Sequence, residues 1–338
     1  MAVPEVDLSR RREKPFEMKT PSPETPVSTG DTKGARGLTA PPAQPVRRNL
    51  PIPFNILLVL PAQLTVLSVV LVPTLIVIWL ALTDWQPTQA IPWWQAQPIW
   101  FWNFVDLWYD ERFVNAVLRT FLVVAIAIVL ELVLAIGLAL LFVEEWLWKR
   151  LAVSVVILPM MIIPVDAANA FFMLFNEHGP INHMVSLVTG QKFTFSWLSH
   201  PTWAMVPIIL CEVWQWTPLM FLMVLTGMMN LPQNQVRAAI ALGAGPGRIF
   251  RRIMLPLMMP VIGIALLIRA IETFKIFDPV YILTRGQPGG ATETISMYMY
   301  NGAFVYFRMG YIAAAALVVL FLVISVCLAL SRPLTRHS

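Results

Sequence analysis

The residues of this sequence that are best suited to bind a solute lie inside long apolar stretches. Glu212 is followed closely by Trp214, Gln215 and Trp216 within the stretch 203–229. Carboxylate and amide groups hydrogen-bond hydroxyl groups, and indole rings pack on apolar C–H faces, so this group suits a polyhydroxy ligand. The alternative is that Glu212 pairs with a residue of another helix and that both Trp side chains only pack. In either case, a carboxylate in such a stretch is expected to face the interior of a helix bundle.

Two further groups of polar residues are candidates for a solute path. Asp166 and Asn169 follow a proline within an apolar stretch. Arg269, Glu272 and Lys275 are spaced three residues apart, so that neighbouring pairs can meet on one flank of a helix. We expect these three residues to form an internal ion ladder, which either is purely structural or contacts the ligand at one end.

The sequence holds no pattern that indicates catalysis or a metal site. Glu131 lies deep in an apolar stretch, and we expect it to make a contact within the bundle. We find no nucleophile–base motif, no paired-carboxylate motif and no G-x-x-x-x-G-K-[ST] phosphate loop. The residues of metal-ligating type lack ligand spacing; they are His178, His183, His200, Cys211 and Cys327. We therefore expect no catalytic residue, no metal and no bound cofactor in this chain.

The composition indicates that membrane-spanning elements position these residues. The chain has 338 residues, of which 57% are hydrophobic and 13% are charged, and its mean hydropathy is +0.68. Water-soluble domains carry about 25% charged residues, so an ordinary globular enzyme is excluded. The formal net charge of +5 reflects a basic N-terminal segment and charged loops, and it does not indicate a nucleic-acid partner.

Six apolar stretches have about the 20 residues needed to cross a bilayer, and they cover 54–82, 114–143, 151–176, 203–229, 256–282 and 309–331. Each must be helical, because lipid offers no partner for a free backbone N–H or C=O. Internal prolines such as Pro61, Pro159, Pro164 and Pro218 predict kinks. The predicted fold class is therefore an all-α integral membrane protein, with six transmembrane helices in a domain over 51–338.

Residues 1–50 differ from the rest of the chain and are predicted to be a disordered cytoplasmic arm. They contain eight prolines, nine Lys or Arg and six Asp or Glu, but no long apolar run. Arg10, Arg11 and Arg12 either touch anionic lipid or belong to a solvated tail. Loop Lys and Arg residues number ten on the side of the N-terminus and five on the other, which predicts that both termini are cytoplasmic. The Trp-rich outer segment after the first span is expected to be an interfacial hairpin or, alternatively, a sugar-stacking surface.

The internal loop between the fourth and fifth spans, residues 231–256, is predicted to contain two short helices. The first covers 233–242 and ends at Gly243, since glycine commonly terminates helices. Pro246 suits the first turn of the second helix, which carries three arginines. The alternative is a basic loop that only obeys the positive-inside rule.

The spacing of this loop resembles the cytoplasmic signature of the permeases of binding-protein-dependent ABC importers, which reads Glu-Ala-Ala, three residues, Gly, nine residues, Ile-x-Leu-Pro. The positions that match without a gap are Ala238, Ala239, Gly243, Ile253, Leu255 and Pro256. Arg237 stands where the family has Glu, and Leu242 stands where an Asp is common before the Gly. The resemblance implies that the helix 233–242 rests in a cleft of a separate ATPase and transmits closure of the ATPase dimer to the spans.

The resemblance covers about residues 54–331 and is closest to carbohydrate-type permeases, such as those for maltose, trehalose and glycerol phosphate. The stretches that are similar to the third to fifth spans and adjoining loops of these permeases are 158–182, 197–204, 213–232 and 277–304. The family implies a type I importer permease fold in the bacterial cytoplasmic (inner) membrane. Its implied partners are a second permease subunit, expected to be a different chain, an ATPase dimer that holds ATP and Mg, and an extracytoplasmic solute-binding protein.

The function that the resemblance implies is ATP-driven import of a sugar or polyol. The same machinery could instead carry glycerol, a glycerol phosphate or an oligosaccharide. A stand-alone secondary transporter is the alternative of a different class, but such proteins often contain an internal repeat, and we find none.

Overall fold

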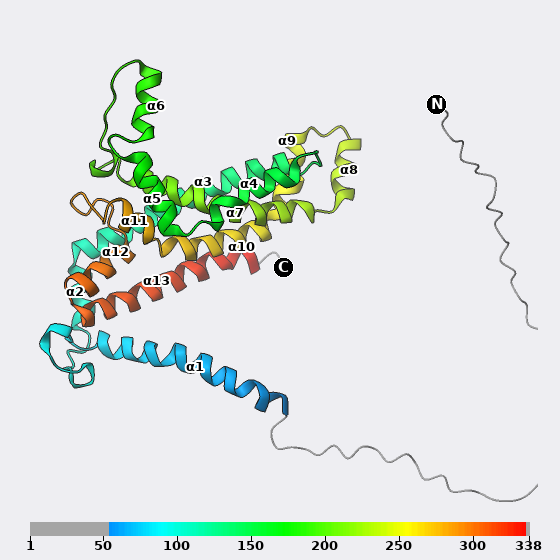
Figure 1. Ribbon diagram of the computed structural model, residues 1–338. Coiled ribbons are helices and arrows are strands. Elements are labelled where there is room, and N and C mark those ends of the chain that lie inside the picture. Colours follow the sequence, from blue (N-terminus) through cyan, green and yellow to red (C-terminus); the bar gives the residue numbers. More distant parts are fainter. Residues whose placement is uncertain (1–53, 336–338) are drawn as a thin grey trace, which may run out of the picture. The chain divides into compact units, whose positions relative to one another are not determined.

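The computed structural model describes residues 54–335, which form helices joined by loops (Figure 1). Residues 1–59 make up one unit of the chain, and residues 60–338 make up a second one, which holds every candidate solute-binding residue. The predicted arm, 1–50, lies outside the described residues, as do residues 336–338.

Long apolar helices dominate the described residues, and they are α1 (Phe54–Ala81), α3 (Glu111–Phe142), α7 (Met205–Met229), α10 (Leu255–Phe274) and α13 (Met309–Thr335). The shorter helices are α2 (Trp102–Tyr109), α4 (Lys149–Met161), α5 (Pro164–Phe175), α6 (Pro180–Thr189), α8 (Gln233–Ala241), α9 (Pro246–Ile249), α11 (Asp278–Leu283) and α12 (Ile295–Tyr300). Three 3₁₀ turns cover Pro87–Gln89, Trp93–Gln95 and Trp197–Ser199, and two π-helical turns cover Phe250–Met254 and Asn301–Val305. Within residues 54–335, five helical segments are long and apolar enough to cross a membrane, or six if one bent pair counts as a single span.

The predicted third span, 151–176, is broken rather than kinked. α4 ends at Met161, and the helical segment that begins at Pro164 leaves it at an angle of 94°. Ile162 and Ile163 between them have extended backbone angles, as expected for residues ahead of a proline. The prolines therefore indicate the place of the bend, whereas its size depends on the helices against which α4 and α5 pack.

The predicted fifth span, 256–282, also differs from the structure. Its helix begins earlier, because α9, the π-helical turn and α10 follow one another without a loop. Pro256 lies in the first turn of α10, directly after the π-helical turn, where a residue without an N–H is tolerated. α10 stops at Phe274, and α11 begins as a separate short helix at Asp278.

The core forms where one stripe of α3 packs against α7. The buried residues of α3 recur every three or four positions, as the inward face of a helix does, and they include Thr120, Val123, Ala127, Glu131, Ala135 and Ala139. Small residues in this stripe allow close approach of the two backbones. Large apolar side chains on the opposite side of α3 are exposed, as a lipid-facing surface requires; they include Leu118, Val129 and Val133.

Several of the short helices lie at the two ends of the bundle in Figure 1, whereas α4 lies alongside the long helices. α8 and α9 lie at one end, and α6, α11 and α12 lie at the other. α7 runs from the second end toward α8, and α10 runs back toward α11, so each long helix links a loop cluster to the opposite one.

Candidate functional site

Three charged side chains from different helices meet inside the bundle. Arg269 of α10 donates to Glu131 of α3 through Nε to Oε2 at 2.7 Å and through Nη2 to Oε1 at 2.8 Å. Its Nη2 also donates to Oε1 of Glu212, on α7, at 2.9 Å. Arg269 and Glu131 are fully buried, and Glu212 is 5% exposed. We call these three residues the ion triad; it ties α3, α7 and α10 together.

Burying three ions is unfavourable unless they are closely paired, and the geometry of the triad meets this condition. The guanidinium lies over the ring of Trp216, with Cζ 5.1 Å from the ring centroid, which adds a cation–π contact. Glu212 of α7 thus pairs with Arg269 of α10, as the second of the two sequence alternatives states. Glu131 makes its contact within the bundle, as expected.

The triad replaces the ion ladder that the sequence predicts on one flank of α10. Arg269 pairs with carboxylates of other helices, and Lys275 donates to Glu272 alone, at 3.1 Å. The physical reason is burial. Arg269 has no access to water and needs carboxylates that are equally buried, whereas Glu272 and Lys275 are exposed. Spacing along one helix does not reveal partners on two others.

A cavity of about 270 Å³ adjoins the triad, and we call it the inner cavity. Its walls include Glu212, Gln215, Trp216, Arg269, Glu272 and Lys275, together with the first residue of α5 and the first turn of α11. Among the described residues, Oε1 of Gln215 and Nη1 of Arg269 are buried and have no hydrogen-bond partner. Buried polar atoms are normally paired, so these two atoms leave hydrogen-bonding capacity unused beside the inner cavity.

The remaining predicted path residues do not line the inner cavity. Asp166 and Asn169 are exposed on α5, and Nδ2 of Asn169 donates to the carbonyl of Val165 at 3.0 Å. Trp214 packs against Phe171, with 5.6 Å between ring centroids. The bend before α5 turns this helix so that only its first residue reaches the cavity.

Several residues at or near the inner cavity were missed by the sequence reasoning. Thr273 is fully buried one helical turn after Arg269, and its Oγ1 has no hydrogen-bond partner among the described residues. Its spacing of four from Arg269 is a signal that could have identified it. Phe277, Asp278 and Pro279 reach the cavity because the chain turns between α10 and α11, and the sequence gives no such signal for them.

α8 ends as the sequence predicts. Gly243 has a φ of +76°, and its N–H donates to the carbonyl of Ile240 at 2.9 Å. The N–H of Ala244 donates to the carbonyl of Ala239 at 3.0 Å, and this pair of bonds is a Schellman motif, which favours glycine at its left-handed position. Pro246 then begins α9, also as predicted.

The other signature residues lie in or just before α10. Ile253 belongs to the π-helical turn, and Leu255 and Pro256 are the first residues of α10. The predicted second helix is shorter than expected, because α9 has four residues and Arg251 and Arg252 already lie in the π-helical turn.

α8 presents a mixed surface to its surroundings. Arg237 and Ala238 are exposed, and Arg237 has no ion-pair partner among the described residues. Just beyond them Ile240 is exposed, and Leu242 is 88% exposed.

A buried polar network at the start of α3 has no counterpart in the sequence reasoning. Asp110 caps α3 by accepting bonds from the amides of Arg112 and Phe113 at 2.8 and 3.1 Å. Its other oxygen accepts bonds from the hydroxyls of Tyr298 and Tyr311 at 2.6 and 2.7 Å. Burial alone would raise the pKa of Asp110, but these hydrogen bonds outweigh it and lower the pKa below its ordinary value.

A bidentate ion pair continues this network. Arg112 donates to Glu293 through Nε at 2.7 Å and Nη2 at 2.6 Å, and Asn301 donates to the same carboxylate at 2.9 Å. The pair fixes the loop after α11 to the start of α3. An Asp before a helix is a recognisable cap, whereas no local signal pairs positions this far apart in sequence.

Comparison with known proteins places the chain in a family. Residues 111–334 match the inner membrane component of binding-protein-dependent transport systems. The probable ABC transporter permease protein y4oQ of Sinorhizobium fredii (strain NBRC 101917 / NGR234) is 31% identical over 289 residues, which cover 85% of this chain and 91% of that protein. The trehalose/maltose transport system permease protein MalF of Thermococcus litoralis is 28% identical, with 75% and 83% covered. The sulfoquinovosyl glycerol transport system permease protein SmoG of Agrobacterium fabrum is 29% identical, with 80% and 86% covered.

A solved structure is similar in fold. The crystal structure of a bacterial ABC transporter involved in the import of the acidic polysaccharide alginate matches with a TM-score of 0.71 at 21% identity, over 84% of this chain and 96% of that chain. The helical arrangement is thus that of a type I ABC permease-like fold. The chain belongs to the family of binding-protein-dependent transport system inner membrane components, the permeases of ABC importers, and is a multi-pass protein of the inner membrane.

Proposed function

We propose that this chain is a permease subunit that moves a sugar or polyol inward across the membrane, driven by a separate ATPase. Family membership supports the transport role, and two relatives are named for trehalose/maltose and for sulfoquinovosyl glycerol. The observation that carries the choice of solute is the inner cavity beside the ion triad.

The inner cavity offers the groups that a polyhydroxy solute needs. Nη1 of Arg269 is a free donor and Oε1 of Gln215 is a free acceptor, so both can bind hydroxyl groups. The indole of Trp216 supplies an apolar wall for the C–H face of a sugar ring. Glu272 and Lys275 lie at the exposed side of the cavity, where a solute can first be met.

The charge of the inner cavity favours a neutral solute. Its walls carry three carboxylates, from Glu212, Glu272 and Asp278, and two cations, from Arg269 and Lys275, so the formal charge is −1. A negative cavity repels an anion. We therefore favour a neutral sugar or polyol, with glycerol or a neutral oligosaccharide as the alternatives, over glycerol phosphate.

Coupling to the ATPase is assigned to α8 and the segment that follows it. The exposed side chains of Ile240 and Leu242 form an apolar surface that a partner cleft can cover. α9, the π-helical turn and α10 follow without a loop. A displacement of α8 would therefore be transmitted along α10 to Arg269. Because Arg237 brings a positive charge where the family signature has Glu, we expect an acidic residue or a carbonyl-rich helix end on this ATPase.

The orientation follows from the same assignment. With α8 and α9 on the cytoplasmic side, the cluster of α6, α11 and α12 at the opposite end of the bundle faces the outside (Figure 1). The excess of Lys and Arg in the loops on the α8 side supports this orientation. We therefore assign both termini to the cytoplasm.

In this proposal, other subunits of the importer supply ATP hydrolysis, solute delivery and the second half of the channel. We assign ATP and Mg to an ATPase dimer and solute delivery to an extracytoplasmic solute-binding protein. We also assign a second permease subunit, which is a different chain and completes the channel. α1 has an apolar surface that is almost entirely exposed: only 6% of its most apolar 18-residue stretch is buried. Lipid or the second subunit can cover this surface.

Uptake by the reconstituted importer tests this proposal. Vesicles with this chain and its partners are compared for uptake of trehalose and maltose. The variants Gln215→Leu and Trp216→Ala should each lower uptake about tenfold or more, because each removes about 1.4 kcal/mol or more of solute binding. Trp148→Ala, at a 64% exposed position that does not line the inner cavity, is the matched control and should keep the wild-type rate. Wild-type uptake by both inner-cavity variants would refute the assignment.

A further inference from the structure

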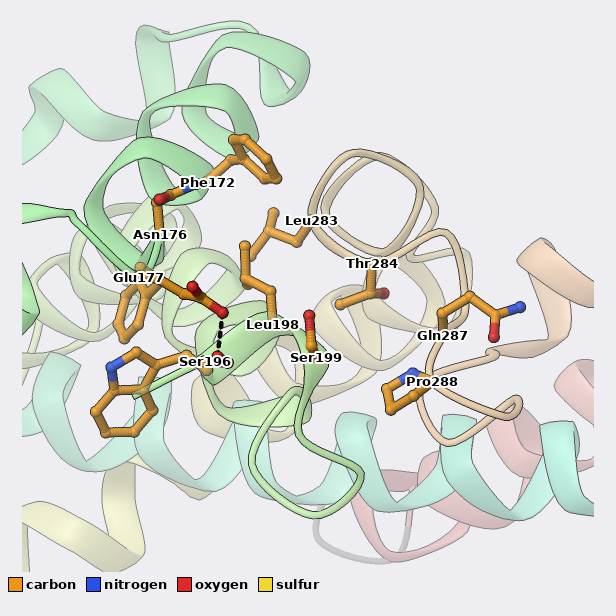
Figure 2. Close-up of a pocket in the computed structure, with 12 residues that line it drawn as sticks. Phe172, Asn176, Glu177, Ser196, Leu198, Ser199, Leu283, Thr284, Gln287 and Pro288 are labelled. Atoms are coloured by element: carbon orange, nitrogen blue, oxygen red, sulfur yellow. Dashed lines mark hydrogen bonds between the residues drawn. The ribbon is translucent and has the colours of Figure 1, made fainter. Parts of the chain in front are cut away.

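A second cavity, of about 370 Å³, lies at the end of the bundle opposite α8, and we call it the outer cavity. Two stretches of chain form it, and Figure 2 shows them facing each other. Glu177, Ser196 and Ser199 belong to the stretch between α5 and α7, whereas Thr284 and Gln287 belong to the end of α11 and the loop after it. The volume falls within the range of about 300–1,000 Å³ that is typical of ligand pockets.

The outer cavity has polar groups whose hydrogen-bonding capacity is not used. Oε1 of Glu177 accepts a hydrogen bond from the hydroxyl of Ser196, drawn as a dashed line in Figure 2, and Oε2 accepts none among the described residues. Asn176, Ser199 and Gln287 are exposed, and within the part of the chain that the structure describes Nδ2, Oγ and Nε2 of these residues make no hydrogen bond. Hydrogen-bond donors and acceptors therefore line the same cavity, and such an arrangement can bind several hydroxyl groups of one ligand.

An aromatic wall completes the outer cavity and is held rigidly. Nε1 of Trp197 donates to Oδ1 of Asn182 at 2.8 Å. The indole also makes edge contacts with Phe175 and Phe195, with ring centroids 5.8 and 4.8 Å apart. A side chain fixed in this way loses little conformational entropy when a ligand binds. Phe172 adds a partly exposed ring to the same wall.

The outer and inner cavities are arranged in series along one pair of helices. Pro164 at the start of α5 lines the inner cavity, and Phe175 at the end of α5 lines the outer one. α11 repeats this order, since its first residue, Asp278, lines the inner cavity and its last, Leu283, lines the outer one. At 1.5 Å per residue, the lining residues at the two ends lie roughly 16 Å apart along α5 and roughly 8 Å apart along α11.

We propose that the outer cavity is a first binding subsite for a neutral sugar ring, occupied before the solute reaches the inner cavity. This inference rests on the proposed function. Its walls combine the indole of Trp197 and the ring of Phe172 with one carboxylate and uncharged polar groups, and no Lys or Arg lines it among the described residues. That combination suits hydroxyl groups and apolar C–H faces, and it disfavours an anionic solute.

Protection of an introduced thiol tests the subsite directly. The complete importer in lipid nanodiscs carries Ser199→Cys in a Cys327→Ala background, and the rate of labelling by a polar maleimide is measured with trehalose or maltose. The remaining native thiol, Cys211, is buried. At about four times its dissociation constant, a competing sugar slows labelling about fivefold. Thr202→Cys, an exposed position three residues further on that does not line the cavity, is the matched control and should label at the same rate with and without sugar.

A second substitution tests whether the sugar that protects position 199 is bound in the outer cavity. Glu177→Gln keeps the acceptor for Ser196 but loses the charge, so it should raise the sugar concentration for half-protection about tenfold. Glu144→Gln, an exposed loop position, should not change it. The inner-cavity variant Trp216→Ala should lose uptake while protection at position 199 remains.

The outcomes separate the two proposals. Protection at 199 that weakens in Glu177→Gln supports the outer subsite. If the importer takes up trehalose or maltose but neither sugar protects position 199, the outer subsite is refuted and the proposed function stands. If the importer takes up neither sugar and neither protects, the proposed function fails for trehalose and maltose, and the subsite fails with it for these two sugars.

Discussion

Arg269 and Glu131 form a bidentate ion pair across 138 positions of the chain, with N–O distances of 2.7 and 2.8 Å and no exposure to solvent. The pair joins α10, which follows the coupling segment, to α3, which forms the core with α7. Glu212 extends the contact to α7. In the proposed mechanism, movement of α10 therefore changes the environment of the only guanidinium that lines the inner cavity among the described residues.

Arg269→Met should destabilise the protein strongly, because it leaves two buried carboxylates without a cation. Removing one partner of a buried ion pair lowers the free energy of unfolding by about 3–5 kcal/mol. Lys275→Met is the matched control; it removes an exposed partner of Glu272 and should cost less than about 1 kcal/mol. Thermal unfolding midpoints of the detergent-solubilised chain measure both. Equal midpoints for the two variants would contradict the role of the triad.

Gly243→Val should lower the ATPase activity that the loaded binding protein stimulates, while the protein still inserts into the membrane. A Cβ at this position would meet no atom within 4 Å, so the penalty comes from the backbone φ of +76° rather than from a clash. A left-handed conformation costs most L-residues roughly 1–2 kcal/mol, and a β-branched residue is worse. Gly247→Val is the matched control, since its Cβ also meets nothing and its φ is ordinary. ATPase activity stimulated by the loaded binding protein should fall in the first variant alone; an equal effect of both would exclude the backbone explanation.

Arg237→Glu should weaken assembly with the partner ATPase, although it restores the residue of the family signature. Like charges across an interface cost several kcal/mol, whereas Arg237→Ala removes attraction without adding repulsion and should do less harm. Pull-down yield and ATPase stimulation are compared for the wild type and both variants. A graded loss from wild type through Ala to Glu is expected. Identical values for all three would mean that Arg237 serves only the positive-inside rule.

Asp110→Asn should lower stability at neutral pH by about 1.5–3 kcal/mol, because an amide oxygen replaces a carboxylate that accepts four hydrogen bonds. The folded-state pKa of Asp110 lies below the ordinary value of 3.8. The stability that its charge contributes is therefore present above pH 3.8 and is lost as the pH falls through the folded-state pKa. Unfolding midpoints of wild type and variant should converge in that acidic range; a gap that stays constant there would contradict the assignment.

The sequence predicted those features that depend on neighbouring residues. Gly243 and Pro246 gave the end of α8 and the start of α9, because helix ends follow local backbone rules. The apolar stretches gave the all-helical fold in the same way. The sequence did not predict the ion triad, since its partners lie on three helices and a spacing of three residues fits a ladder equally well. The outer cavity was also missed, because it needs the loops after α5 and α11 to meet.

The central claim is that solute import through this chain requires ATP hydrolysis by partners. Its most direct test compares trehalose and maltose uptake by two kinds of proteoliposome. One holds this chain with the second permease, the ATPase dimer, the binding protein and ATP, and the other holds this chain alone. We predict uptake of at least one of the two sugars by the first kind, which stops when ATP is omitted, and no uptake by the second. Uptake by this chain alone, or uptake by the complete importer without ATP, would contradict the claim.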